Sequence, residues 1–202
     1  MGNKSSPTPE AKLKQCALSI IVPTPDGGYL QELFDSFRSQ LEKQDEVIIV
    51  GDTHSRPLED VREQVLAEGF RWLEYDAGLH AWGHPQINYG ITQAKGDYLV
   101  FIDDDDTFAH DAFQNIRKAV QEAPGRPHMF RFVSGRCGTL WKEQTIQQAC
   151  VGGHEFVVPN RPELLGEWSD RYEGDYDFIV STLEKWPKDS LVWREEIISY
   201  AR

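Results

Sequence analysis

Three observations predict an α/β fold with a mostly parallel sheet flanked by helices. Apolar runs of strand length alternate with segments of helical spacing through the first half of the chain. The first two runs end in turn residues, at 24–28 and at Gly51-Asp52, and the most apolar run, residues 98–102, leads directly into four aspartates. Strands and helices that alternate in this way form parallel sheets, and such sheets bind ligands at the carboxyl ends of their strands.

In the first half, short β-branched or apolar runs predict strands, and apolar residues that recur every three or four positions predict helices. Leu30, Leu33, Phe34 and Phe37 are an example of the helical spacing. The predicted elements are, in chain order, a strand at 18–23, a helix at 30–41, a strand at 46–50, a helix at 58–66, a strand at 71–75, a helix from Pro85 to Gly96, a strand at 98–102 and a helix at 109–123.

The second half has a different pattern, with short strands separated by polar loops. Strands are predicted at 129–134, 139–141 and 155–158, followed by a helix at 175–186 and a last segment at 191–200. Chains of about this length commonly form one domain. We therefore expect a flexible tail at 1–15 and a single domain at 16–202, in which 16–125 is a nucleotide-binding half and 126–202 is a mixed, substrate-binding half.

The composition is that of a globular protein, with 40% apolar residues and a formal net charge of −12 over 202 residues. This charge argues against binding to duplex nucleic acid, which depends on Lys and Arg, and suggests that a phosphate ligand would need a metal. The three cysteines form no close pair, and no apolar run is long enough to span a membrane. We therefore expect a soluble, cytoplasmic protein, and a homo-oligomer is possible.

The four aspartates, Asp103 to Asp106, have two interpretations. They could cap the helix that follows, because acidic residues favour helix N-termini. Like charges this close repel, however, and a divalent cation with oxygen ligands relieves that repulsion. On an extended segment Asp103 and Asp105 would face one ion together while Asp104 faced away. Their position at the end of a strand favours the metal site.

Three blocks of the sequence resemble a family 2 glycosyltransferase of the GT-A fold. They are residues 18–24, residues 47–52 and residues 88–106, which include Asn-x-Gly, Ala-x-Gly and the aspartate run. Their order and spacing match that family over residues 18 to about 120, while the last third of the chain matches loosely. The resemblance implies a GT-A fold, a nucleotide-sugar donor and Mn²⁺ or Mg²⁺ as cofactor.

For the donor, the resemblance implies that Pro23 and Thr24 line the nucleotide pocket and that Asp52 contacts the base or ribose. Asp52 could instead be a turn residue that stabilises Gly51. Asn88 falls on the family's asparagine, but Ile87 replaces the arginine that often precedes it, so His84 or Gln86 could compensate. Asp103 and Asp104 are also assigned to the nucleotide sugar.

For the metal, the resemblance implies Asp103 and Asp105, with Asp106 as a supporting carboxylate. His154 could be a third ligand, or it could be a structural histidine. The family's Asp-x-Asp motif joins the metal to the nucleotide diphosphate, whose negative charge grows as it leaves.

For the acceptor side, the resemblance implies that Asp175 is the general base, with Gly174 in place of the family's usual glutamate. Asp177 is the alternative base, and Asp175 could instead only cap its helix. Gly153 belongs to a loop that would approach the transferred sugar. Trp168 and Tyr172 could stack on an acceptor, although aromatic side chains at such positions can equally belong to the core.

The sequence thus predicts a metal-dependent, inverting glycosyltransferase that moves a sugar from a nucleotide sugar, expected to be a UDP-sugar, to a hydroxyl acceptor. One alternative is a nucleotidyltransferase on a similar sheet, which would normally have a basic, Gly-rich loop after the first strand. Residues 24–28 contain no Lys or Arg. The other alternative is a nucleotide-sugar-binding module without catalytic activity.

Overall fold

The computed structural model describes residues 16–54, 57–78 and 82–202, so the expected tail at 1–15 lies outside the described residues. The strands are β1 (Leu18–Thr24), β2 (Glu46–Asp52), β3 (Arg71–Tyr75), β4 (Tyr98–Phe101), β5 (Thr107–Phe108), β6 (His128–Ser134), β7 (Gly138–Leu140), β8 (Phe156–Pro159) and β9 (Val192–Ala201). The α-helices are α1 (Leu30–Phe37), α2 (Glu59–Ala67), α3 (His84–Gln93), α4 (Ala112–Glu122) and α5 (Gly174–Leu183). Short 3-10 helices lie at Arg38–Gln40, Gly153–Glu155 and Pro162–Leu164.

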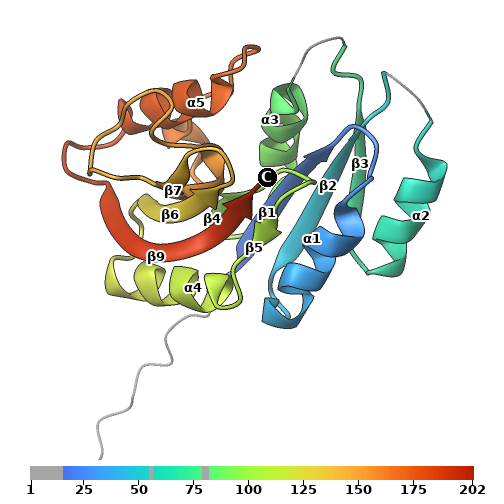
Figure 1. The fold of residues 1–202 in the computed structure, drawn as a ribbon, viewed down its shortest axis with the longest axis horizontal. Helices are drawn as coiled ribbons and strands as arrows, with labels where there is room; N and C mark the ends of the chain where they lie inside the picture. Colours follow the sequence, from blue (N-terminus) through green and yellow to red (C-terminus); the bar gives the residue numbers. More distant parts are fainter. Residues whose placement is uncertain (1–15, 55–56, 79–81) are drawn as a thin grey trace, which may run out of the picture.

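The strands of the described residues form a mixed sheet in the order β3-β2-β1-β4-β8-β6-β9-β5, with β7 on β6 (Figure 1). The first four strands in this order run parallel, which confirms the predicted α/β fold. β8 pairs antiparallel with both β4 and β6, so it joins the parallel part to the C-terminal part. The carboxyl ends of β1, β2 and β4 therefore meet at one edge, next to the C-terminal part.

The alternation of side chains along the strands produces a separate core on each face of the sheet. Leu18, Ile20 and Val22 of β1 belong to a cluster that also contains the apolar faces of α1 and α4. Ile21, between them, points to the other face and joins a cluster built from α3, α5 and β8. The second core is the one that packs beneath the region where β4 ends.

Most predicted elements are present, and the differences lie at their ends. The first α-helix ends at Phe37 and continues as a short 3-10 turn, and α4 begins at Ala112 rather than at 109. β5 was not predicted, because two residues carry no periodic signal. None of the helices within the described residues is long and apolar enough to cross a membrane.

Candidate active site

The loop after β1 is tied to the aspartate run by a buried hydrogen bond. The Thr24 hydroxyl donates to Oδ2 of Asp104, and Thr24 Oγ1 accepts the Gly27 N–H at 2.8 Å. Burial, opposed by the Thr24 hydrogen bond and reinforced by the neighbouring aspartates, raises the pKa of Asp104 to about 7. Pro23, just before Thr24, packs under α3, where a Cβ on Gly83 would lie 2.9 Å from the Pro23 ring. These contacts fix the end of β1 against β4 and α3.

Asp52 ends β2 and is 8% exposed. Its Oδ1 accepts the N–H of His54 at 2.9 Å and that of Ala77 at 3.4 Å, so the carboxylate organises the turns after β2 and β3. The turn interpretation of Asp52 is therefore part of its role. Contact with a nucleotide stays a prediction.

The aspartate run is not extended beyond β4. The Asp106 N–H bonds to the Asp103 carbonyl at 3.3 Å, which closes a turn over Asp104 and Asp105. Because this segment turns, the alternation of an extended strand does not apply to Asp103 and Asp105, and their joint binding of one ion stays a prediction. The turn instead brings together the side chains of Asp103 and Asp106.

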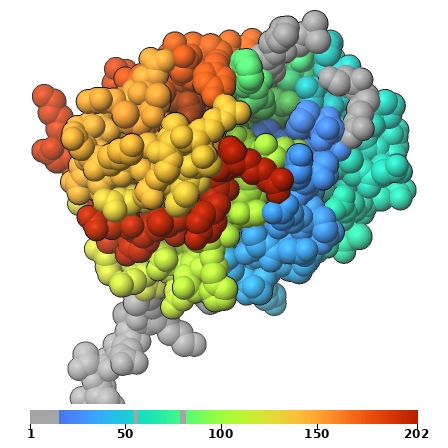
Figure 2. All heavy atoms as spheres, in the orientation of Figure 1, coloured from blue at the N-terminus to red at the C-terminus, as the bar shows by residue number. Residues whose placement is uncertain are grey.

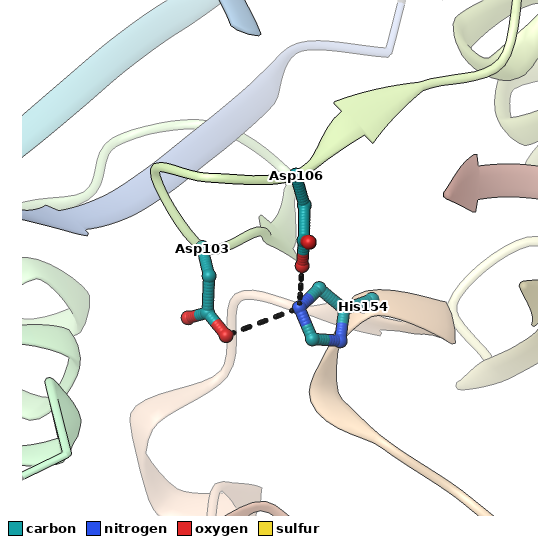
Figure 3. A group of neighbouring side chains, drawn as sticks. All are labelled: Asp103, Asp106 and His154. Atoms are coloured by element: carbon teal, nitrogen blue, oxygen red, sulfur yellow. Dashed lines mark ion pairs between the residues drawn. The ribbon is translucent and has the colours of Figure 1, made fainter. Parts of the chain in front are cut away.

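His154 lies between these two carboxylates (Figure 3). Its Nε2 is 2.6 Å from Asp106 Oδ2 and 3.2 Å from Asp103 Oδ2. Ligand atoms of the three residues all lie within 4.8 Å of one another, as in a metal site. Asp105 does not belong to this group among the described residues, and its assignment to a metal stays a prediction.

The electrostatics of this group follow from burial and charge. Burial would lower the pKa of His154, but Asp103 and Asp106 outweigh it and hold that pKa well above its usual value. Burial would raise the pKa of Asp103, yet His154 keeps it below the usual range. Burial and the two flanking carboxylates raise the pKa of Asp105. The two carboxylates thus favour the protonated form of the imidazole between them.

Asp106 is also held from the far end of the chain. The N–H of Arg202 donates to Asp106 Oδ1 at 3.0 Å. Figure 2 shows the residues at the end of β9, in red, reaching the blue surface of α1, where the Arg202 side chain pairs with Glu32. The group at the end of β4 is therefore braced by β9 as well as by the turn.

A cavity of about 380 Å³ opens beside this group. Six of the predicted site residues line it together: Asp103, Gly153, His154, Trp168, Tyr172 and Asp175. Asp103 comes from the donor half, and the other five come from the half assigned to the acceptor. The cavity is therefore the place where the two halves meet.

The two candidate bases differ sharply in surroundings. Asp175 is the second residue of α5 and lines the cavity, and burial raises the pKa of its carboxyl. Its Oδ1 accepts the Tyr176 N–H at 2.6 Å. Asp177 instead pairs with Arg171 and accepts the Ser169 hydroxyl, and these contacts lower its pKa to about 2. A base needs a raised pKa and access to substrate, so the geometry favours Asp175.

The loop before β8 carries a buried carboxyl that the sequence analysis did not assign. Glu155 is fully buried, and its Oε1 accepts the Gly152 N–H at 3.0 Å. Burial holds the pKa of Glu155 well above its usual range.

Gly153 must be small because a Cβ there would lie 2.2 Å from the Trp168 ring. Trp168 is 5% exposed and stacks on Phe178 at 5.1 Å between ring centroids, so its indole is a core group that also forms one wall of the cavity. Tyr172 is 67% exposed and meets Trp82 edge to face. Of the two predicted aromatic residues, only Tyr172 presents an open ring face at the cavity.

Asn88 does not line this cavity. Its amide makes two hydrogen bonds with the backbone of Trp168, donating to the carbonyl at 2.8 Å and accepting the N–H at 3.1 Å. These bonds connect α3 to the segment before α5, and Asn88 lines a separate, larger cavity. The structure thus gives Asn88 a positioning role, and its contact with the donor sugar stays a prediction.

Comparisons with known proteins gave a family and several structural neighbours. The family model described as Glycosyl transferase family 2 matches residues 19–149. A crystal structure of S. aureus TarS aligns with a TM-score of 0.75 and 15% identity over 92% of this chain and 36% of that chain. TarS 1–349 in complex with UDP-GlcNAc aligns with a TM-score of 0.73 and 16% identity over 92% of this chain and 58% of that chain.

A third neighbour is glucosyl-3-phosphoglycerate synthase from Mycobacterium tuberculosis in complex with Mn²⁺, UDP and glucosyl-3-phosphoglycerate. It aligns with a TM-score of 0.67 and 12% identity over 93% of this chain and 72% of that chain. At identities this low, the structural matches establish a shared fold alone. The chain spans only about a third of the full TarS structure. No curated protein sequence gave a significant match.

Proposed function

Because the chain belongs to glycosyl transferase family 2, we propose that it transfers a sugar from a UDP-sugar to a hydroxyl group of an acceptor, with inversion at the anomeric carbon. One observation carries the proposal. A single cavity joins Asp103 at the end of β4 to Asp175 at the start of α5. Structures of TarS with UDP and UDP-GlcNAc support this choice of donor.

In the proposed reaction, Asp175 accepts the proton of the acceptor hydroxyl while its oxygen bonds to the anomeric carbon. The bond from that carbon to the diphosphate oxygen breaks, and the electron pair leaves with UDP. Burial favours this role, because a carboxylate with a raised pKa is a stronger base. The exposed rings of Tyr172 and Trp82 at the cavity would stack on the acceptor.

The residues at the end of β4 fit a divalent cation. Asp103 and Asp106 would supply carboxylate oxygens and His154 an imidazole nitrogen, which are ligands suited to Mn²⁺. His154 would bind as the neutral imidazole, so the proton on the nitrogen that faces Asp106 would be released when the cation binds. Mn²⁺ or Mg²⁺ bound there would offset the charge of the departing diphosphate. The presence of Mn²⁺ in the neighbouring synthase supports this assignment.

The test is UDP release from UDP-GlcNAc and UDP-glucose in the presence of Mn²⁺ and methyl glycosides as acceptors. Asp175→Asn keeps an acceptor for the Tyr176 N–H but cannot take up a proton, so the rate should fall by roughly 10² to 10⁴ while UDP affinity stays unchanged. Asp177→Asn is the matched control and should retain the rate. Equal rates for Asp175→Asn and the wild type would overturn the assignment of the base. UDP binding without any release would indicate a binding module.

A further inference from the structure

His84 lines the same cavity next to the start of α5, and the proposed reaction gives it no role. It is the first residue of α3, is 6% exposed and lines the cavity with Asp103 and Asp175. Its Nδ1 lies 2.8 Å from the Ser169 carbonyl oxygen. A carbonyl only accepts, so Nδ1 carries a proton and donates it. This bond fixes the orientation of the ring.

The other ring nitrogen, Nε2, is left for a ligand. No polar group of the described residues forms a hydrogen bond with Nε2. Nε2 is also absent from the fully buried polar atoms without a partner, so this atom keeps some exposed surface. In a neutral imidazole whose Nδ1 is protonated, Nε2 is a hydrogen-bond acceptor. The cavity is therefore lined by an oriented ring nitrogen that no hydrogen bond among the described residues uses.

The start of α5 is shaped around this ring. A Cβ on Gly174 would lie 2.3 Å from His84 Nδ1 and 2.5 Å from its Cε1, so a larger residue at 174 would displace the imidazole. Gly174 directly precedes Asp175. The space that a side chain at 174 would fill, beside the proposed base, is thus occupied by His84.

We propose that His84 is a specificity-determining residue whose Nε2 accepts a hydrogen bond from a sugar hydroxyl bound in the cavity. The inference rests on the proposed function, because it needs a sugar beside Asp175. The hydroxyl belongs either to the donor sugar or to the acceptor, and both present the same chemistry to the imidazole. Loss of this hydrogen bond would weaken binding of the sugar and leave binding of the nucleotide unchanged.

Two substitutions separate the two ring nitrogens. In His84→Asn, the side-chain amide can donate to Ser169 as Nδ1 does, but nothing replaces Nε2. In His84→Gln, the longer side chain can reach the position of Nε2 but gives up the bond to Ser169. We expect His84→Asn to keep the melting temperature and lose sugar recognition, and His84→Gln to lower the melting temperature and keep that recognition.

The measurements are calorimetric affinities for UDP, UDP-GlcNAc and UDP-glucose with Mn²⁺, together with UDP release in the presence of methyl glycosides. If the hydroxyl is the donor's, His84→Asn weakens binding of a UDP-sugar about five- to tenfold and leaves UDP affinity unchanged. If it is the acceptor's, UDP-sugar affinity is unchanged and the KM for the methyl glycoside rises by a similar factor.

A His84→Asn variant that matches the wild type in UDP-sugar affinity and in UDP release would overturn this inference alone. A wild-type protein that binds neither UDP nor a UDP-sugar would overturn the proposed function and the inference together. A loss of UDP affinity equal to the loss of UDP-sugar affinity would contradict a role at the sugar.

Discussion

Asp104 shows how one residue of an acidic run can behave differently from its neighbours. It is 9% exposed, whereas the side chain of Asp103 is about half exposed. Burial raises its pKa to about 7, while the Thr24 hydroxyl opposes the shift and Asp105 and Asp103 add to it. The carboxyl therefore titrates near neutral pH, where a bound cation would favour its ionised form.

This shift predicts a pH-dependent stability. In the unfolded chain Asp104 ionises near pH 4, so between about pH 4 and 7 the native protein holds a proton that the unfolded chain has released. The contribution of Asp104 to the free energy of unfolding is therefore present below about pH 4 and is lost as the pH rises to about 7. Asp104→Asn keeps an acceptor for Thr24 and removes the buried charge. Its free energy of unfolding should exceed that of the wild type by about 2 to 4 kcal/mol at pH 8, and the difference should shrink toward pH 4.

Urea denaturation with a chelator present, at pH 4, 6 and 8, measures this difference. The chelator keeps adventitious metal from compensating the charge. A difference between the two proteins that stays constant across this range would show that the pKa of Asp104 is the same in the native and the unfolded state.

The role of Asp52 in the turns and its predicted contact with the nucleotide can be tested separately. Asp52→Asn retains an oxygen that can accept the N–H groups of His54 and Ala77, so the melting temperature should be unchanged. The charge-assisted contact with the nucleotide would be lost, and UDP binding should weaken by about 1.5 to 3 kcal/mol in calorimetry. If UDP affinity is the same in both proteins, Asp52 serves only the turns.

At this scale six of the residues assigned from the sequence line the cavity, because short motifs at strand and helix ends carry their identity. The sequence analysis placed Asp105 beside Asp103 and gave Asp106 only a supporting role, because alternation applies to extended segments and this segment turns. It also left Glu155 unassigned. Hydrogen bonds between residues distant in sequence, such as those of Asn88 with Trp168, have no local signal.

Among the elements, the parallel strands were the most predictable. β1, β2 and β4 are buried almost throughout and so appear as continuous apolar runs. β3 is an edge strand with two exposed residues, but it has the predicted bounds 71–75. The C-terminal strands depend on distant pairing. β9 runs parallel to β6 with shifts in register and also pairs with β5, an arrangement that no local pattern specifies.

The structure of the loop at 152–155 predicts how substitutions at Glu155 change stability. Its geometry depends on the bond from the Gly152 N–H to Glu155 Oε1, in a site where burial favours the neutral carboxyl. Glu155→Gln is a neutral replacement of similar shape and should be at least as stable as the wild type at pH 8. Glu155→Ala leaves a cavity and an unpaired N–H, and should lose about 2 to 4 kcal/mol of unfolding free energy.

Chemical denaturation of the three proteins at pH 8 provides the comparison. UDP release should follow the same order, because His154 and Gly153 belong to this loop. A Glu155→Gln variant as unstable as Glu155→Ala would mean that the native carboxyl is ionised.

In the whole molecule, β8 determines where the cavity lies. It joins the parallel part, which ends in Asp52 and Asp103, to the C-terminal part, which supplies His154 and Asp175. The two cores hold this junction from both faces of the sheet, and loops from both parts line the cavity. In the proposed reaction, a donor bound by one part would lie against a base held by the other.

The most direct measurement is a crystal structure of the protein soaked with Mn²⁺ and UDP, with manganese located by anomalous diffraction. We expect a manganese peak coordinated by Asp103, Asp106 and His154, with the diphosphate beside it and the uracil near Asp52. A manganese peak remote from these residues, or UDP bound instead in the larger cavity lined by Asn88, would contradict a nucleotide-sugar site at the end of β4.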